Sequence, residues 1–554
     1  MRQSIAVLSV AVALFWGAPP PMAAQTVPTD EYLNHEQLTS TVQSLVGSHG
    51  NLASVRSLAQ TAEGRDVWLM TLGSGSDDAL DRRPGLLIVA NLEANHLVGS
   101  STALITAEHL LTGYGADDEV TRLLDERTVY IIPRLNPDGA ERYWSIPGYE
   151  LPFKPHSDNP DLGGMNITEL GSDLTGDGFV TMMRVPDPDG TLMVDPDEPR
   201  LLREANRARA ERGGYSVMIE GIDPANVDAY VPMGSDGVNL NRNFPHEYLY
   251  YQPHVGPHQV SEPETRALAD LMYEQVNIAS VITFSPYDNL RSVPPTSRQV
   301  PDGVAPGPPS IPTNILAQDR PFYEYISEQF RDITGLDGDG EAGEAGSFAQ
   351  FAYYQLGLPA FTTPVWTIDA DTEGDSRDHQ WLQLLDAHGI DGFIEWTEAE
   401  HPTLGTVEVG GFRPNARVNP PVEMVDELAR SHAAFAVWLG HQLPEIEVVE
   451  TTIESRGDNV FMVTATIQND RYMPTQFQMG TRVRTNRPIT VRLMPTDGMT
   501  VLTGNIQQQI QRLEGMGARH TFSWLVQAPA GTDVEMELFA ERAGGLQSTT
   551  LTLR

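Results

Sequence analysis

Short apolar runs alternate with longer helical patterns through most of the chain. Runs at 86–90, 129–135 and 281–285 are mostly apolar, which predicts short buried strands. Patterns with a helical period at 101–111 and 264–275 lie between them. Strands that alternate with helices in this way predict an α/β layer architecture around a largely buried sheet.

The pattern changes after Pro444. Apolar and polar residues then alternate in short segments separated by turn residues, and a helical period stands out only near 505–513. The alternating segments are 460–468, 489–493, 520–526 and 534–539. Several short strands of this kind predict a β-sandwich of about a hundred residues. We therefore expect an α/β domain over 25–444 and a C-terminal β-sandwich domain over 445–554.

Length and the N-terminal segment refine this division. The 554 residues, 40% of them hydrophobic, exceed one ordinary core and suit a globular protein of two or more domains. Residues 1–24 contain Arg2, an apolar run at 5–16, and Ala23 and Ala24, which is the layout of a secretory signal. The run is too short to span a bilayer. We expect an exported protein, periplasmic or secreted, without a membrane span.

Cysteine content and charge exclude several kinds of chemistry. The chain has no cysteine, which rules out disulfides, thiolate nucleophiles and cysteine zinc sites, so any metal would be held by histidines and carboxylates. With 36 basic and 75 acidic residues the formal charge is −39. A nucleic-acid partner is not expected, because binding phosphates requires clustered Lys and Arg.

Four segments together resemble the zinc carboxypeptidases related to carboxypeptidase A. The likeness covers roughly residues 30–400, and its motifs occur in the family's order. They are Glu93 and His96 after the run at 85–90, Asn-Pro-Asp-Gly at 136–139, Gly-Val-Asn-Leu-Asn-Arg-Asn-Phe at 237–244 followed by 261–265, and the stretch 346–366. The resemblance implies a carboxypeptidase-like α/β/α sandwich with a mixed sheet, a zinc cofactor, and hydrolysis of the C-terminal bond of a peptide or protein with a free C-terminus.

The resemblance also assigns candidate site residues. Glu93 and His96 correspond to the first two zinc ligands with the ligand types exchanged, and zinc accepts both types. A hydrogen bond between the two side chains in a former metal pocket is the alternative. Asn241 and Arg242 correspond to the pair that binds the substrate's terminal carboxylate, for which a guanidinium is well suited; Arg242 could instead serve a buried Asp or a sheet-end carbonyl. Arg184 corresponds to the arginine that polarises the substrate carbonyl, with an ordinary surface role as the alternative.

Two family positions are substituted. The third zinc ligand, a histidine at the end of a later strand, is expected at Thr283 or Phe284, and neither residue type is among the usual zinc ligands, although Asp288 could supply an oxygen. The general base aligns with Val365, which cannot move a proton, and losing such a base costs about 10²- to 10⁴-fold in rate. Glu341 or Glu344 could substitute for it.

These substitutions leave two functions open. One is an exported zinc metallocarboxypeptidase. The other is a non-catalytic pseudopeptidase that binds peptide or glycan ligands in the same cleft. Residue chemistry favours the second reading and family membership favours the first.

A second metal candidate is an Asp-rich turn. Asp173, Thr175 and Asp177 supply oxygens at the first, third and fifth positions of a calcium loop, and a turn glycine follows. The twelfth position, normally a glutamate, is Arg184, which excludes a complete EF-hand. The sequence leaves open an incomplete calcium turn or a plain Asp-Gly turn.

Overall fold

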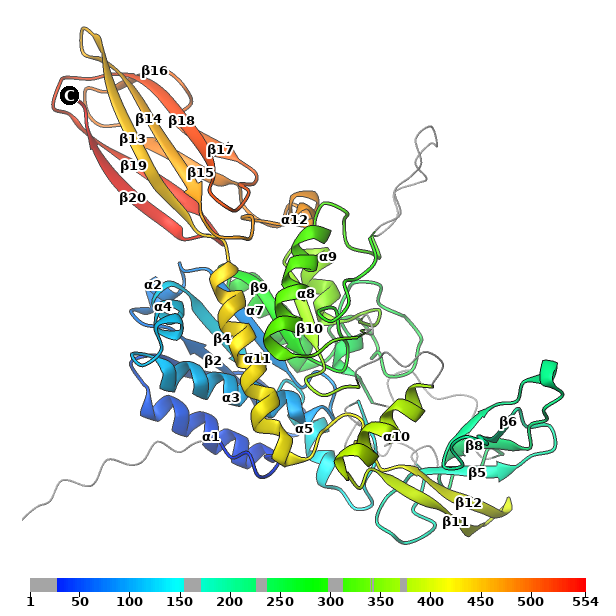
Figure 1. Ribbon diagram of the computed structural model, residues 1–554. Helices are drawn as coiled ribbons and strands as arrows, with labels where there is room; N and C mark the ends of the chain where they lie inside the picture. Colours follow the sequence, from blue (N-terminus) through cyan, green and yellow to red (C-terminus); the bar gives the residue numbers. More distant parts are fainter. Residues whose placement is uncertain are drawn as a thin grey trace, which may run out of the picture.

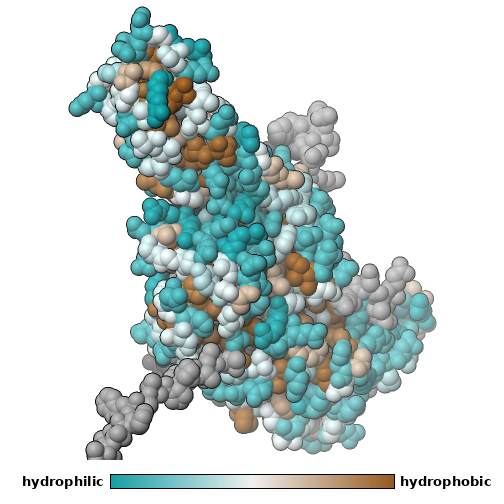
Figure 2. Space-filling view, turned by 60° about the vertical axis from the view of Figure 1, so that its left-hand side comes forward, coloured by the Kyte–Doolittle hydropathy of each residue, from teal (hydrophilic) through white to brown (hydrophobic). Residues whose placement is uncertain are grey.

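The computed structural model describes residues 27–153, 171–225, 237–296, 312–338, 340, 343–368 and 376–554. An α/β body carries a smaller all-β domain that projects from one end (Figure 1 and Figure 2). The export signal expected over 1–24 lies outside the described residues. Within them, no helix has both the length and the apolar character needed to cross a bilayer.

A six-stranded mixed sheet forms the centre of the body, in the order β1-β2-β4-β3-β9-β10. Its strands are β1 (Ala53–Gln60), β2 (Asp66–Leu72), β3 (Gly85–Ala90), β4 (Thr128–Ile132), β9 (Ile278–Phe284) and β10 (Ala360–Thr363). Strands β3, β4, β9 and β10 are parallel, β2 runs antiparallel to its neighbours β4 and β1, and β1 therefore has the same direction as the central strands. Every residue of β3, β4, β9 and β10 is buried, as the apolar runs within β3, β4 and β9 predict.

Helices pack around this sheet. They are α1 (His35–Ser48), α2 (Asp77–Leu80), α3 (Leu97–Gly113), α4 (Asp118–Glu126), α5 (Pro137–Ala140), α7 (Pro263–Glu274), α8 (Arg320–Thr334), α9 (Phe348–Leu356), α10 (Arg377–His388) and α11 (Val422–Gln442). Helix α11 packs against α3 and α8, α7 contacts β1, and α9 contacts β9 and β10. The body therefore has the α/β/α layers and mixed sheet that the sequence predicts.

A second sheet, which the sequence pattern does not predict, lies beside the body (Figure 1). Its order is β11-β12-β5-β8-β6-β7. The strands are β5 (Met182–Pro186), β6 (Leu192–Val194), β7 (Leu202–Glu204), β8 (Tyr215–Ile219), β11 (Phe393–His401) and β12 (Gly405–Phe412). Met183, Val407 and Val409 form a small core on one face. Strands β5, β6 and β7 are short and largely half-exposed, so they carry little of the apolar periodicity on which prediction depends.

The C-terminal domain consists of two four-stranded sheets, β13-β14-β18-β16 and β17-β15-β19-β20. The strands are β13 (Ile446–Gly457), β14 (Val460–Asn469), β15 (Ile489–Met494), β16 (Thr500–Thr503), β17 (Gln507–Ile510), β18 (Ala518–Gln527), β19 (Asp533–Ala540) and β20 (Gly545–Thr552). Phe461 and Trp524 from one sheet share a core with Val491 and Leu538 from the other. The helical period near 505–513 is not realised, because this segment forms β17 and pairs with β15.

The two parts meet at α12 (Gln478–Val483), which returns to the body and packs against α9. A Cβ on Gly357 would lie 2.2 Å from the Cα of Gly480, so the two backbones need glycine to approach this closely. The carboxylate of Asp319 accepts from the first amides of α12, at 2.6 Å from Gln478 N and 3.1 Å from Met479 N. The division at residue 444 stays a prediction, because the segment that carries α12 belongs to the packing of the body.

Candidate active-site cleft

The turn after β3 positions the two residues assigned to zinc. Asn91 has a left-handed backbone, with φ of 58°, and its Nδ2 donates to the carbonyl oxygens of Glu93 at 2.9 Å and Ala94 at 3.0 Å. His96 then precedes α3 as its N-cap residue. Both candidate residues therefore lie at the carboxyl end of a central parallel strand, where α/β proteins bind their ligands.

The carboxylate of Glu93 is buried and already bonded. Its Oε1 accepts from Asn241 Nδ2 at 2.6 Å and from Ser285 Oγ at 3.1 Å. Its Oε2 is buried without a hydrogen-bond partner among the described residues. Burial raises the pKa of Glu93 to about 7, although the bonds from Asn241 and Ser285 oppose this rise.

The imidazole of His96 forms a hydrogen bond with a residue other than Glu93. Its Nε2 lies 3.0 Å from the carbonyl oxygen of Pro364, and because a carbonyl only accepts, Nε2 must carry the proton. The Nδ1 atom is buried without a partner in the described part of the chain. Burial lowers the pKa of His96 to about 4, so the ring is neutral at neutral pH. The side chains of Glu93 and His96 thus bond to different partners rather than to each other.

The residue at the end of β9 that reaches Glu93 is Ser285, one position beyond the two expected from the sequence. Thr283 Oγ1 lies 3.4 Å from the carbonyl oxygen of Phe361 instead. Phe284 packs edge-on against His432. The alignment of Thr283 or Phe284 with the third-ligand position stays a prediction, and the side chain that bonds to Glu93 belongs to the first residue after the strand.

Asp288, the other candidate third ligand, is buried in a local ion pair. Its Oδ2 accepts from Arg291 Nε, and its Oδ1 accepts from the backbone amides of Leu290 at 2.7 Å and Arg291 at 2.9 Å. These bonds occupy the carboxylate within its own turn. Asp288 therefore has no contact with Glu93 or His96.

The residues present do not fit the zinc site that the family implies. A catalytic zinc takes three protein ligands and keeps a fourth position open. Here one carboxylate and one imidazole remain, and Ser285 donates its hydroxyl proton to Glu93. Within the described residues, no three His, Cys, Asp or Glu side chains come together in a group that could hold a metal.

Val365 stands two positions after β10, at the place assigned to the general base. It is fully buried and has a φ of 65°, a left-handed conformation that is strained for a β-branched residue. The preceding carbonyl, from Pro364, is the one that faces His96. Of the two substitute bases, Glu344 lies 3.0 Å from Arg242 Nε, and Glu341 is outside the described residues.

Of the Asn-Arg pair, Asn241 lies in the interior and Arg242 lines the cleft. Asn241 uses its whole amide internally, because Oδ1 accepts from Phe348 N at 2.9 Å and Nδ2 donates to Glu93 and, at 3.3 Å, to Ser285. Arg242 lines the cleft with its side chain 22% exposed. Of the two residues assigned to carboxylate binding, Arg242 is therefore the one that a ligand can reach.

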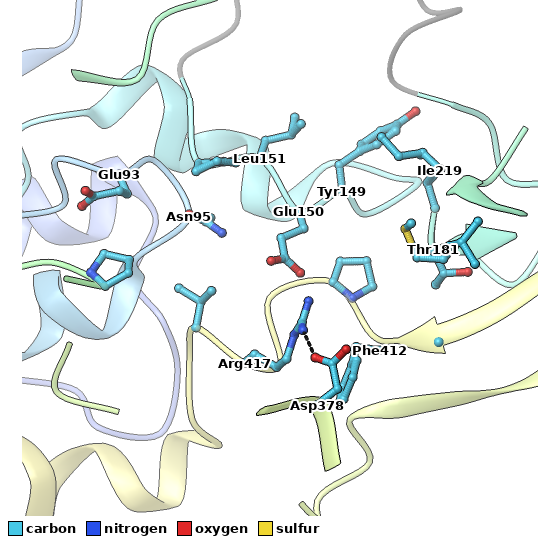
Figure 3. A pocket seen from close by; sticks show the side chains of 18 of the residues that line it. Glu93, Asn95, Tyr149, Glu150, Leu151, Thr181, Ile219, Asp378, Phe412 and Arg417 are labelled. Carbon is cyan, nitrogen blue, oxygen red and sulfur yellow. Dashed lines mark hydrogen bonds and ion pairs between the residues drawn. The ribbon is translucent and has the colours of Figure 1, made fainter. Parts of the chain in front are cut away.

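The cleft is a cavity of about 1050 Å³ between the body and the second sheet. Glu93, Arg242 and Tyr287 line the side of the body, and burial together with the nearby carboxylates of Glu93 and Glu344 raises the pKa of Tyr287. Figure 3 shows Glu93 at one end and Ile219 of the second sheet at the other.

Arg184 belongs to the second sheet and is held by its neighbours. Its Nε and Nη2 donate to both carboxylate oxygens of Glu408, at 2.8 and 3.0 Å. Its guanidinium lies over the ring of Trp396, 4.6 Å from the centroid. The role in substrate binding that the resemblance implies stays a prediction, with no contact in this structure to support it.

In the Asp-rich turn, backbone amides of the turn itself donate hydrogen bonds to the Asp side chains. Asp173 accepts from the amides of Gly176 at 2.6 Å and Gly178 at 2.9 Å, and Asp177 accepts from Phe179 N at 2.9 Å. From the interior, Glu220 accepts from the amides of Leu174 and Thr181, which flank the turn. The calcium role proposed for Asp173, Thr175 and Asp177 therefore has no support in the structure, because these bonds already satisfy the carboxylates.

Comparison with known protein families identifies the family to which the chain belongs. Residues 38–369, more than half of its length, match the family described as zinc carboxypeptidase. This protein belongs to the zinc carboxypeptidase family. Residues 445–551 match a domain of unknown function.

Individual relatives are similar over short stretches. Mouse carboxypeptidase M is 25% identical over 131 residues, which are 24% of this chain and 30% of that protein. Human carboxypeptidase D is 30% identical over 111 residues, 20% of this chain and 8% of that protein. The inactive metallocarboxypeptidase ECM14 of Uncinocarpus reesii is 27% identical over 124 residues, 22% of this chain and 21% of that protein. The matched stretches thus cover less than a third of these relatives' own length.

Solved structures show more distant similarity. The crystal structure of thrombin activatable fibrinolysis inhibitor aligns with a TM-score of 0.41 and 12% identity over 75% of each chain. Carboxypeptidase A from Helicoverpa armigera aligns with a TM-score of 0.39 and 13% identity, over 74% of this chain and 73% of that one.

Proposed function

We propose that this protein binds peptides through their free C-terminal carboxylate and does not cleave them by the zinc-dependent route of its family. One observation carries the proposal: the Glu93 carboxylate is bonded to Asn241 and Ser285, where a zinc site needs ligands free to coordinate. With Val365 at the general-base position, the conventional reaction lacks both a complete set of metal ligands and its base.

Arg242 is the proposed carboxylate receptor. A guanidinium matches a carboxylate with two parallel hydrogen bonds, and such charge-assisted contacts contribute about 1.5 to 3 kcal/mol. Its charged partner, Glu344, is 44% exposed and 3.0 Å away, and Arg242 Nη1 also donates to the carbonyl oxygen of Pro253 at 3.3 Å. An ion pair this exposed is worth about 0 to 1 kcal/mol, so a ligand carboxylate can displace it.

A second candidate, metal-assisted hydrolysis of the C-terminal bond, has a specific observation in its favour. Glu93 Oε2 and His96 Nδ1 are both buried without hydrogen-bond partners in the described part of the chain. Buried polar atoms normally have partners, so these two atoms are the natural places for an added ion. Zinc, which the family implies, would then have two protein ligands instead of three.

Binding of a matched pair of peptides tests the proposal. Calorimetry at low salt compares a peptide acid with its C-terminal amide on the wild type, on Arg242→Ala, and on Arg456→Ala, a control whose side chain is 55% exposed in the C-terminal domain. The acid should bind about 10- to 150-fold more tightly, and only Arg242→Ala should erase the difference. Equal binding of acid and amide to the wild type would overturn the proposal.

Mass spectrometry of the same mixtures separates the two candidate functions. We expect the peptide to remain intact. Release of the C-terminal residue by the wild type, lost in Glu93→Ala, would establish the hydrolase and reject the binding-only role.

Export is part of this proposal. The apolar run with small residues after it, over 1–24, supports passage through a membrane and removal of the segment. N-terminal sequencing of the protein recovered from its native compartment tests it, because a mature chain that begins near residue 25 is expected.

A further inference from the structure

The wall of the cleft opposite Glu93 is built by the second sheet and is apolar. Its lining side chains come from strands far apart in the chain, so the wall exists only once the sheet has formed. They are Met182, Leu192, Val217, Ile219, Phe393 and Trp396. Strands β11 and β12 lie beyond residue 369, where the match to the family ends, so part of this wall belongs to a region outside the family match.

Two of these side chains form a single exposed patch. Met182 of β5 and Ile219 of β8 are paired across the two strands, so their side chains lie side by side on one face. Met182 is 36% exposed and Ile219 is 40% exposed. Large apolar side chains that stay accessible inside a concave site mark a place where a ligand removes them from water.

Trp396 gives the wall a rigid aromatic element. Its Nε1 donates to the carbonyl oxygen of Arg200 at 2.7 Å, which satisfies the one polar atom of the ring. The guanidinium of Arg184 stacks 4.6 Å from the ring centroid and is itself held by Glu408. The indole is thus fixed before a ligand arrives, which lowers the entropy lost on binding.

The cations on this side of the cleft are already neutralised. Arg200 pairs with Glu198 at 2.8 Å and with Asp386 at 2.6 Å. Arg417 pairs with Asp378 at 2.8 Å, a contact visible in Figure 3. The second sheet therefore offers apolar contact rather than charge, and the carboxylates that line the cleft disfavour acidic side chains of a ligand.

We infer that the second sheet selects peptides that carry bulky apolar side chains near the C-terminus. This inference rests on the proposed function, because Arg242 on the body would hold the terminal carboxylate while the apolar patch receives the preceding side chains. The ligand class is thus a peptide with a free carboxylate and an apolar C-terminal segment.

Two probes of equal length test this selectivity by calorimetry. Acetyl-Leu-Phe-Leu-Phe and acetyl-Ser-Gln-Ser-Gln, both as free acids, are compared on the wild type and on the double variant Met182→Ser/Ile219→Ser. The control is Ile506→Ser, a residue that is 43% exposed in the C-terminal domain. The apolar peptide should bind roughly tenfold or more tightly than the polar one, and the double variant alone should lose this preference.

The outcomes distinguish the selectivity inference from the proposed carboxylate recognition. Equal binding of the two peptides, or an unchanged preference in a double variant with a wild-type circular dichroism spectrum, would overturn the selectivity inference. A different outcome is that the amide of the apolar peptide binds as tightly as its acid while the apolar preference persists. This result would overturn carboxylate recognition and would still support the selectivity of the apolar wall. No binding of either peptide would reject both.

Discussion

Asn241 Nδ2 donates a 2.6 Å hydrogen bond to Glu93 Oε1, joining residues that are 148 positions apart in the chain. The family resemblance assigns the amide to the substrate and the carboxylate to zinc. In this protein the amide donates to one oxygen of the carboxylate, and the hydroxyl of Ser285 donates to the same oxygen. Arg242, next to Asn241, is left as the member of the pair that faces the cleft.

The purified wild-type protein should retain less than one zinc per chain after dialysis. Only Glu93 and His96 remain as ligands, and both side chains are drawn into other contacts. Ser285→His adds an imidazole at the same strand end and should retain more zinc. Elemental analysis checks both proteins, and one tightly held zinc per wild-type chain would contradict the prediction.

Glu93→Gln should stabilise the protein at alkaline pH. The pKa of Glu93 is raised in the folded state to about 7 from an ordinary 4.5, so the folded protein favours the neutral carboxyl. The stability that this group contributes is complete below about pH 4.5 and is lost as the pH rises to about 7. The loss is at most about 3 kcal/mol above pH 7, and glutamine, which cannot ionise, avoids it.

Urea unfolding at pH 4.5 and pH 8 measures this effect. The gain from Glu93→Gln should appear at pH 8 and shrink toward zero at pH 4.5. Glu450→Gln, on an exposed position of β13, serves as the control and should change little at either pH. A gain of the same size at both pH values would exclude the proposed titration.

Glu344→Gln should strengthen the binding of free-acid peptides. Glu344 lies 3.0 Å from Arg242 and competes with the incoming carboxylate for the guanidinium. Because the pair is exposed, its removal should improve affinity by at most about fivefold. Calorimetry with the matching C-terminal amide provides the control, since the amide should bind equally to both proteins, and weaker binding of the acid would count against Arg242 as the receptor.

Glu445→Gln should destabilise the junction between body and C-terminal domain. Arg127 is fully buried and pairs with Glu445 at 2.9 Å, and Arg471 pairs with the same carboxylate at 2.7 Å. Removing the carboxylate that pairs with a buried guanidinium costs up to about 3 kcal/mol, although Arg127 keeps its hydrogen bonds to the carbonyl oxygens of Gly440 and Glu126. Denaturant unfolding should show this loss against Glu447→Gln, an exposed control on β13. Equal midpoints for the two variants would show that the pair contributes little.

Prediction from the sequence succeeded for strands whose burial produces a continuous apolar run in the local sequence. Strands β3, β4 and β9 are buried along their whole length and mostly apolar, because both faces of a central parallel strand are covered, and that pattern is visible in the local sequence alone. The strands of the second sheet lack such a continuous apolar run. Strands β6 and β7 are three residues each and half-exposed, so only pairing between distant segments makes them strands.

The same contrast holds within the site. The sequence by itself determined which chemical groups are available: a carboxylate at Glu93, an imidazole at His96, and no base at Val365. Tertiary structure decided how those groups are used. Strands β3 and β9 are neighbours in the sheet, which brings Ser285 to Glu93, while the turn at 240–242 directs Asn241 inward to the same carboxylate. Hydrogen bonds between residues far apart in the chain depend on how the strands are ordered, and no local pattern of residues encodes that order.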